Sequence, residues 1–300
     1  MTKIDFLYQY YKPEELDLQI NHTLRSLNWF KIDCIAKVLF APKDSTQLGC
    51  FLQNKSKDLQ SFILGLGSNV LFTLPVYDGV VIKLNNFNHI SHDSNTITVG
   101  AGVPNSRLSL YCMQNNMTDL EFLSGIPGCI GGALAMNAGC FGSELADIFI
   151  SAEGFSYEGK KHILTQDDIK FLYRKTIVDQ PYIWTSVKLK YTSSSSDIIS
   201  EKISQIRKLR TAAQPQKVLT AGSTFKNPEN YKAWELIDGA GGRGLQVGGA
   251  KMSELHCNFM IVEADVTASD ILELGTKIKN MVLEKYNINL EWEIVLVGEQ

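Results

Sequence analysis

The feature that most constrains this chain is a glycine-rich stretch in its middle that carries no charged residue. It reads Gly125-Ile126-Pro127-Gly128-Cys129-Ile130-Gly131-Gly132 and continues through Ala133, Ala135, Asn137, Ala138 and Gly139 to Gly142. A flexible glycine linker would be polar, whereas small apolar residues suit close approach of the backbone in a buried place. The stretch therefore predicts a cradle for a phosphate-bearing, largely apolar cofactor. The alternative, a tight helix–helix contact through small residues, would not explain the rigid turn at Pro127.

A second glycine cluster, Gly65-Leu66-Gly67-Ser68-Asn69, follows the apolar run Phe62-Ile63-Leu64. Its glycines permit positive φ and let backbone N–H groups converge on an anion, and Ser68 and Asn69 add side-chain donors. Alone, the pentapeptide reads more simply as a turn between strands. It is neither a dinucleotide fingerprint nor a phosphate loop, because no third glycine opens a helix and no Gly-Lys-Ser/Thr follows.

Composition limits the remaining functions. The 300 residues are 44% hydrophobic and 20% charged with a formal charge of −3, so we expect a folded protein without nucleic-acid or membrane partners. The chain lacks an apolar run of about 18 residues and an apolar signal region near its start. Six scattered cysteines, without a Cys-x-x-Cys pair or metal-ligand spacing, suit a reducing cytoplasm and predict that no metal is bound.

The order of elements predicts an α+β chain with a boundary near residue 195. We expect short strands at Ile35–Pro42, Phe62–Leu64, Val80–Ile82, Thr96–Val99 and Tyr182–Tyr191, with helices at Glu14–Leu24 and Arg107–Asn115. The serines at 193–196 resemble a linker. The division is therefore an N-terminal extension at 1–27, a first domain at 28–193 and a second at 197–300.

The second domain has a clearer pattern. Ile199, Ile203, Ile206 and Leu209 recur at helical spacing until Pro215. Thr267 and Asp270 can cap a closing helix, whose apolar stripe we expect at Ile271, Leu274, Ile278, Met281 and Tyr286. A final strand is expected from Leu290 to Val297.

In their order along the chain, these segments resemble the UDP-N-acetylenolpyruvoylglucosamine reductase family. The resemblance rests on residues 65–69, 125–133 with 136–139, Tyr173-Arg174, Ala221-Gly222-Ser223-Thr224-Phe225-Lys226-Asn227-Pro228, the segment Leu236–His256, and Leu290-Glu291-Trp292-Glu293-Ile294. Any one segment is weak, but six in order are specific. The short connection between residues 174 and 223 matches the shorter subtype of the family, which lacks an extra tyrosine-bearing loop.

The resemblance implies an FAD-binding domain of the vanillyl-alcohol-oxidase type followed by a smaller α+β substrate-binding domain. It implies reduction of the enolpyruvyl ether of UDP-N-acetylglucosamine enolpyruvate to a lactyl ether by NADPH, in peptidoglycan precursor synthesis. None of His22, His89, His92 or His162 lies in a glycine cluster, so we expect the FAD to be bound non-covalently. The substrate is a small nucleotide sugar, and a monomer is favoured.

The resemblance also assigns the candidate site residues. Those expected to contact the cofactor are Gly65, Gly67, Ser68, Asn69, Gly125, Ile126, Pro127, Gly128, Gly131, Gly132, Asn137 and Ala138. Those expected to contact the substrate are Tyr173, Asn227 and His256. Arg174, Ser223 and Glu293 are the candidate catalytic residues.

The chemistry of the three catalytic candidates fits hydride addition to an enolpyruvyl group. Negative charge then develops beside the substrate carboxylate, and the planar cation of Arg174 could hold that carboxylate. Glu293 lies in an apolar strand, where burial raises a carboxyl pKa and favours the neutral acid that can donate to the enolate. Ser223 would give the carbon its proton. Considered alone, the three could instead be a surface charge, a sheet-edge salt bridge and a turn residue.

One segment departs from the family's pattern. Lys31-Ile32-Asp33-Cys34 stands where the family usually has an Arg-Ile-Gly-Gly-like stretch, which puts the backbone near the flavin in doubt. Two other functions therefore stay open: another FAD-dependent oxidase or dehydrogenase of the same fold, and a nucleotide-sugar-binding relative without catalysis.

Overall fold

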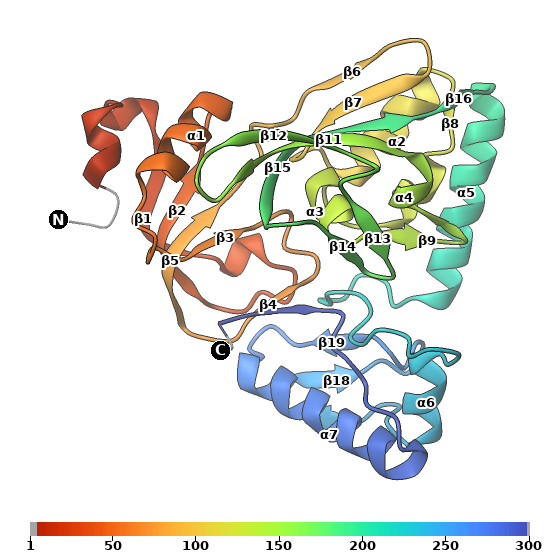
Figure 1. Ribbon diagram of the computed structural model, residues 1–300. Coiled ribbons are helices and arrows are strands. Elements are labelled where there is room, and N and C mark those ends of the chain that lie inside the picture. Colours follow the sequence, from red (N-terminus) through yellow and green to blue (C-terminus); the bar gives the residue numbers. More distant parts are fainter. Residues whose placement is uncertain (1–4, 299–300) are drawn as a thin grey trace. The chain divides into compact units, whose positions relative to one another are not determined.

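The computed structural model describes residues 5–298, which form two compact units (Figure 1). The first unit contains the described chain up to His22 together with Ala36–Leu66 and Asp78–Lys208. The second contains Thr23–Ile35, Gly67–Tyr77 and the chain from Leu209 onward. No helix within residues 5–298 is both long enough and apolar enough to cross a membrane.

This division differs from a single cut near residue 195. The chain already enters the second unit at residues 23–35 and 67–77, and helix α5 (Ser196–Ala213) begins in the first unit and ends in the second. The expected serine linker ends one element and begins the next: Ser193 belongs to β16 (Thr192–Ser193), and the Ser195 hydroxyl, just before α5, accepts a hydrogen bond from the Ile198 amide at 3.4 Å. Serine is a favoured residue at that position.

One sheet has the strand order β1-β2-β5-β3. Its strands are β1 (Asp17–Thr23), β2 (Ile35–Ala41), β5 (Val76–Ile82) and β3 (Ser61–Ile63), and helix α1 (Ser45–Asn54) follows β2. The helix expected at Glu14–Leu24 is wrong: a 3₁₀ turn, η2 (Pro13–Glu15), precedes β1. Polar and apolar residues alternate from Asp17 to Asn21, and this period of two suits a strand.

A larger antiparallel sheet in the first unit has the order β12-β11-β15-β7-β6 (Figure 1). Its strands are β12 (Lys161–Thr165), β11 (Phe149–Ser156), β15 (Tyr182–Lys190), β7 (Thr96–Gly100) and β6 (Ile90–His92). Helix α2 (Asn105–Gln114) follows β7, and the short helix α3 (Ile130–Ala135) packs against β7 and β15. The predicted strands at 96–99 and 182–191 and the helix at 107–115 are confirmed.

Smaller elements complete the first unit. They are η1 (Asp5–Gln9), β8 (Met117–Thr118), η4 (Glu121–Gly125), β9 (Gly139–Cys140), β10 (Ser143–Glu144), α4 (Leu145–Ile148), β13 (Lys170–Leu172), β14 (Lys175–Ile177) and β16 (Thr192–Ser193).

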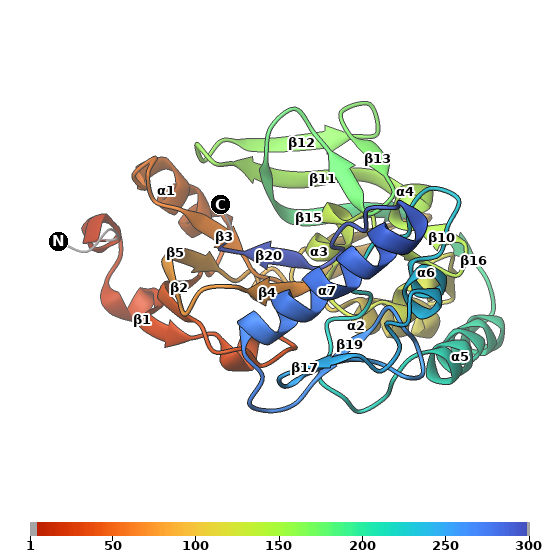
Figure 2. The same cartoon turned by 90° about the horizontal axis from the view of Figure 1, so that it is seen from below.

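The second unit is also α+β. It contains η3 (Arg25–Leu27), β4 (Val70–Phe72), α6 (Ala233–Gly239), β17 (Gln246–Val247), β18 (Ala250–Met252), β19 (Met260–Val262), α7 (Ala268–Tyr286) and β20 (Val295–Val297). Helix α7 packs against β17, β18 and α6, and β20 pairs in parallel with β4 (Figure 2). The predicted Thr267–Asp270 capping box is confirmed, but Val282, rather than Met281, completes the buried stripe.

The strand expected from Leu290 to Val297 changes partner partway along. Its first half runs antiparallel to residues 224–226, where the Lys226 amide donates to the Glu291 carbonyl and the Glu293 amide to the Thr224 carbonyl, both at 2.9 Å. Its second half, β20, is regular and pairs with β4 instead. The apolar pattern therefore predicted the extended backbone correctly, but the regular strand is shorter than predicted, since β20 covers only Val295–Val297.

Gly275 in the middle of α7 shows how closely this extended segment packs. A Cβ atom at Gly275 would lie 2.1 Å from the ring of Trp292, and that ring lies 5.0 Å from the ring of Phe225 between centroids. The glycine therefore lets α7 approach the segment that carries Glu293.

We predict that Gly275→Ala destabilises the protein. Helix propensity alone would stabilise it by about 0.5–1 kcal/mol, but displacement of Trp292 should cost about 1–3 kcal/mol. Thr276→Ala, at the exposed neighbouring position, should change stability by less than about 0.5 kcal/mol. Urea unfolding measures both variants, and a stabilised Gly275→Ala would show that the packing argument is wrong.

Candidate active site

A cavity of about 160 Å³ lies in the first unit, between the two glycine segments. Gly65 and Leu66 line it after β3, and Gly131 and Gly132 line it from α3. Tyr182 and Trp184 of β15 add aromatic rings, which stack at 5.4 Å between centroids. Two segments about 65 residues apart, both singled out in the sequence, thus border one cavity. Ligand sites usually span about 300–1,000 Å³, so this cavity would hold part of a larger ligand.

Bare backbone brings the walls of the cavity together. A Cβ atom at Gly131 would lie 2.9 Å from the Cβ of Ala101, and one at Gly102 only 2.1 Å from the Leu84 carbonyl oxygen. At Gly132, by contrast, the nearest atom would be the sulfur of Cys129 at 3.8 Å. Gly131 and Gly102 therefore serve packing, whereas Gly132 leaves room beside the cavity. The sequence analysis missed Gly102 because it stands outside both glycine clusters.

The backbone of the central stretch is occupied by hydrogen bonds within the protein. The amide of Ile130 donates to the Val103 carbonyl at 3.0 Å, and that of Gly131 donates to the Ala101 carbonyl at 2.9 Å. These two amides are therefore engaged within the protein and fix α3 against residues 101–103.

Residues 125–128 do not line the cavity, although they were expected to contact the cofactor. Asn105 holds them in place: its backbone N–H donates to the Gly128 carbonyl at 3.0 Å, and its side-chain amide donates to the Ile126 carbonyl at 3.2 Å. Gly128 has φ of 125°, which a side chain would strain. We missed Asn105 in the sequence because it lies in an ordinary helical pattern.

Lys83 is a further cavity residue that the sequence analysis did not identify. Its Nζ donates to the Gly65 carbonyl at 3.1 Å, and burial lowers the pKa of the ammonium group. Its position follows from the sheet, because Lys83 comes directly after β5, and β5 pairs in parallel with β3, which leads into Gly65.

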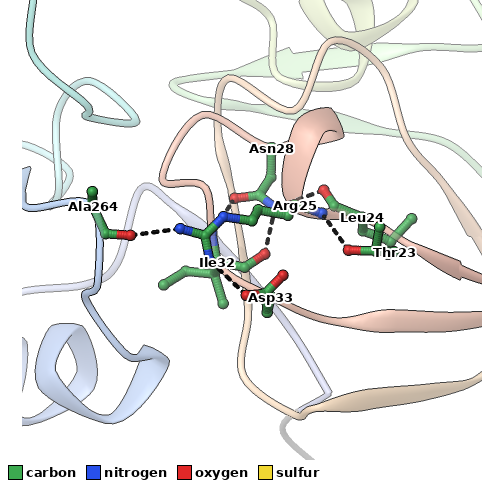
Figure 3. A network of polar contacts seen from close by, with 7 residues as sticks. All are labelled: Thr23, Leu24, Arg25, Asn28, Ile32, Asp33 and Ala264. Atoms are coloured by element: carbon green, nitrogen blue, oxygen red, sulfur yellow. Dashed lines mark hydrogen bonds and ion pairs between the residues drawn. The ribbon is translucent and has the colours of Figure 1, made fainter.

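In the second unit, the turn at residues 24–33 (Figure 3) lies against Gly67. Gly67 has φ of 68°, and a Cβ atom there would lie 2.0 Å from the Leu27 carbonyl oxygen, so only glycine fits. The buried side chain of Asn28 organises the turn by donating to the carbonyls of Leu24 and Ile32, both at 2.9 Å. It also accepts a hydrogen bond from the Ile32 amide.

The unusual Asp33-Cys34 pair fits within this turn. Asp33 forms an ion pair with Arg25 at 2.5 Å, and Arg25 also donates to the Ala264 carbonyl at 2.6 Å (Figure 3). Cys34 is buried, and burial raises the pKa of its thiol to about 11. Its thiol therefore stays protonated at neutral pH.

Arg174 lies in the first unit, in the two-residue turn between β13 and β14. Its φ of 55° is uncommon for a residue other than glycine. The guanidinium donates to the Gly139 carbonyl at 3.2 Å and lies 4.9 Å from the centre of the exposed Tyr173 ring.

Asn137, which is expected to contact the cofactor, has side-chain hydrogen bonds within the protein: it donates to the Leu172 carbonyl of this hairpin and accepts from the Ala146 amide. Ala138 is buried in the core of the unit.

Ser223 and Glu293 lie on neighbouring segments of the second unit. The segment that carries Ser223 is fixed on one side by Asn258, whose buried side chain accepts from the Phe225 amide at 3.0 Å and donates to the Phe225 carbonyl at 2.8 Å. On its other side, the Thr224 carbonyl accepts from the Glu293 amide. Asn258 was not predicted from the sequence. The only signal was that it is a polar residue within the otherwise apolar run Cys257–Ile261.

Asn69 fixes Glu293 from the first glycine cluster. Its side-chain amide donates to the Glu293 carbonyl at 3.0 Å, and its own carbonyl accepts from the Val295 amide at 3.0 Å. The side chain of Glu293 is half-buried, as is that of Ser68. Asn69 therefore positions a candidate catalytic residue, a role that the sequence did not indicate.

The two remaining candidates, Asn227 and His256, also lie in the second unit. The Asn227 side chain accepts a hydrogen bond from the Ala233 amide at 2.9 Å. Burial lowers the pKa of His256, and its Nδ1 accepts from the Asn258 amide at 3.3 Å. A neutral ring with Nδ1 as acceptor carries its proton on Nε2, where it can donate to a ligand.

Within residues 5–298, no cluster of three or more His, Cys, Asp or Glu residues is placed to hold a metal ion.

Comparison with known proteins identifies two family models and several relatives. Residues 36–164 match the family model of an FAD binding domain, and residues 214–297 match that of the UDP-N-acetylenolpyruvoylglucosamine reductase C-terminal domain. A protein named UDP-N-acetylenolpyruvoylglucosamine reductase from Orientia tsutsugamushi (strain Boryong) is 45% identical over 285 residues, which cover 93% of this chain and 94% of that one. The protein of the same name from Rickettsia peacockii (strain Rustic) is 43% identical over 280 residues, covering 93% and 95%.

A solved structure is similar as well. The crystal structure of UDP-N-acetylenolpyruvylglucosamine reductase from Thermus caldophilus matches with a TM-score of 0.81 at 28% identity, covering 94% of this chain and 99% of that one. The predicted fold class, an α+β FAD-binding domain followed by a second α+β domain, is confirmed. The FAD-binding match contains both cavity-lining glycine segments.

We predict that Gly132→Ala weakens FAD binding without destabilising the protein. The added methyl group meets no atom closer than 3.8 Å in the protein, so the flavin-free Tm should stay equal or rise with the improved helix propensity. Crowding of the bound ligand should cost about 1–3 kcal/mol, roughly a five- to 150-fold rise in Kd. Flavin fluorescence titration measures this, with Ser106→Ala on the exposed face of α2 as the control. An unchanged Kd would mean that FAD does not approach Gly132.

Proposed function

The chain belongs to the UDP-N-acetylenolpyruvoylglucosamine reductase family, and we propose that it reduces UDP-N-acetylglucosamine enolpyruvate to UDP-N-acetylmuramate with NADPH. The double bond of the enolpyruvyl ether gains one hydride and one proton and becomes a lactyl ether, while NADPH becomes NADP⁺. This is a step in the synthesis of peptidoglycan precursors. The observation that carries the proposal is the single cavity bordered by residues 65–66 and 131–132 in a chain of this family.

The residues of this cavity fit an FAD group. Glycines without side chains, two stacked aromatic rings and one lysine suit a ligand that has both apolar rings and phosphates. When bound, FAD supplies the hydride-transfer chemistry that the side chains of the protein lack. The remaining tasks, which are to bind, orient and protonate the substrate, fall to residues of the chain.

Arg174 is proposed to hold the substrate carboxylate. A guanidinium is permanently charged and can donate two parallel hydrogen bonds to a carboxylate. Its hydrogen bond to Gly139 and its contact with the Tyr173 ring restrict its orientation before substrate arrives. Such restriction favours catalysis, because less ordering is required in the transition state.

Glu293 and Ser223 are proposed to act on the charge that develops after hydride addition. Glu293, as the neutral acid, would donate a hydrogen bond to the enolate oxygen. Ser223 would transfer its hydroxyl proton to the carbon, a step that depends on geometry because the hydroxyl is a weak acid. Backbone hydrogen bonds between residues 224 and 293 hold the segments of both residues, which supports this assignment.

Tyr173, Asn227 and His256 are proposed to contact the nucleotide sugar. Tyr173 is 48% exposed, so its ring can receive a ligand. The neutral His256 can donate from Nε2 to a phosphate or sugar oxygen.

The decisive experiment measures NADPH oxidation by the purified protein with and without UDP-N-acetylglucosamine enolpyruvate. We expect oxidation that requires the substrate, together with a flavin absorption spectrum. Substrate-independent oxidation with oxygen as acceptor would favour an oxidase of the same fold. Absence of both turnover and flavin would favour a relative that binds nucleotide sugars without catalysis.

We predict that Ser223→Ala separates the two halves of the reaction. Reduction of the bound flavin by NADPH should keep its rate, because no proton from Ser223 is needed. Reoxidation by the enolpyruvyl substrate should slow by about 10²-fold or more, the usual contribution of a positioned acid. Stopped-flow absorbance follows each half-reaction, and Ser200→Ala on exposed α5 is the control. An equal loss in both halves would exclude the proton-donor role.

A further inference from the structure

We propose that Lys83 binds the phosphate groups of the dinucleotide held in the cavity and supplies the positive charge that its glycine segments lack. This rests on the proposed function, since FAD is the ligand it assumes. Three observations lead to Lys83: its unbalanced charge, the engagement of several donors in the glycine segments, and the way the sheet places it.

The charge of Lys83 has no counterion in the described part of the chain. Within residues 5–298, no carboxylate pairs with its Nζ, which donates one hydrogen bond, to the Gly65 carbonyl. The other residues that line the cavity carry no charged carboxylate or guanidinium group. A half-buried ammonium group without an anion is costly, and its lowered pKa reflects that cost. A bound anion would offset this cost, because it would pair with the ammonium group.

Several donors in the two glycine segments are engaged within the protein. The amides of Ile130 and Gly131 donate to carbonyls of residues 103 and 101, and the side chains of Asn69 and Asn137 donate to the carbonyls of Glu293 and Leu172. Lys83 would give a phosphate in the cavity a further donor. An ammonium group has three N–H bonds, of which Gly65 accepts one.

The fold fixes Lys83 beside the first glycine segment. β3 and β5 are parallel neighbours with Ile63 opposite Ile82, so Leu64-Gly65 and Lys83 leave the sheet at the same edge. The Leu64 amide donates to the Ile82 carbonyl, which continues this register. Lys83 also lies within the range that matches an FAD binding domain, so the FAD phosphates are the anion we assign.

The competing explanation is that Lys83 only ties the Gly65 carbonyl in place. Lys83→Gln separates the two, because glutamine keeps an N–H donor for Gly65 but loses the charge. Lys83→Arg keeps both the charge and a donor. Lys190→Met, which removes an exposed lysine of β15, is the control for overall charge.

Five ligands are tested on the flavin-free full-length variants, with two measurements. FAD and riboflavin binding are measured by fluorescence, since riboflavin has the ring system but no phosphate. Inorganic pyrophosphate is tested by its effect on Tm, with UDP and NADP⁺ as alternative sources of phosphate. We expect Lys83→Gln to raise the FAD Kd about tenfold or more, because hydrogen bonds to charged groups are the stronger class. Riboflavin binding should stay unchanged, and the FAD Kd of Lys83→Arg and Lys190→Met should stay within about threefold of wild type.

Distinct outcomes separate this proposal from the proposed function. An FAD Kd of Lys83→Gln within twofold of wild type, or an equal loss of riboflavin binding, would overturn the role of Lys83 while leaving the reductase activity standing. If wild type binds no FAD but pyrophosphate raises its Tm only when Lys83 is present, the anion site stands and the assumed cofactor is wrong. If UDP or NADP⁺, but not FAD, depends on Lys83, the assignment to FAD phosphates is overturned.

Discussion

Close approach of bare backbone is the constraint on which the rest of this structure depends. A single methyl group at Gly67, Gly102 or Gly131 would overlap a carbonyl or a side chain of another segment. Interiors are packed so densely that such overlap cannot be absorbed without moving the backbone. Where these segments meet they form the wall of the cavity or the support of Asn69. These glycines thus act by letting neighbouring segments approach closely, and of the predicted glycines Gly65, Gly131 and Gly132 line the cavity.

The second unit uses a different device to fix its candidate catalytic residues. Residues 223–226 lie between residues 256–260 and 291–293, and backbone hydrogen bonds join them on both sides. Asn258 strengthens one side because its side-chain amide pairs with both backbone groups of Phe225. Rigid neighbours of this kind hold Ser223 and Glu293 at a fixed spacing, which general acid chemistry requires.

Local chemistry could be predicted from the sequence, whereas long-range pairing could not. In the uncharged stretch predicted to form a cradle, Gly131 and Gly132 line the cavity, whereas residues 125–128 do not. Thr267 with Asp270 indicated the start of α7, because that signal lies within a few neighbouring residues. Lys83 gave no signal, since a lysine after Val-Val-Ile resembles any strand end, and only the pairing of β3 with β5 brings it to Gly65. The side-chain partners of Asn137 gave no signal for the same reason: they are Leu172 and Ala146, which lie 35 and nine residues further along the chain.

The Asp33-Cys34 pair shows how a departure from the family's pattern can leave the site intact. Arg25 neutralises Asp33 within the turn, and Cys34 stays buried as a protonated thiol, so neither residue forces the backbone apart. The turn still brings the Leu27 carbonyl against Gly67, and Gly67 leads directly to Asn69, which holds the Glu293 carbonyl. Each link of this chain of contacts lies inside the second unit and is made by the residues present here. The substitution therefore gives no reason to assign a binding protein without catalysis in place of a reductase.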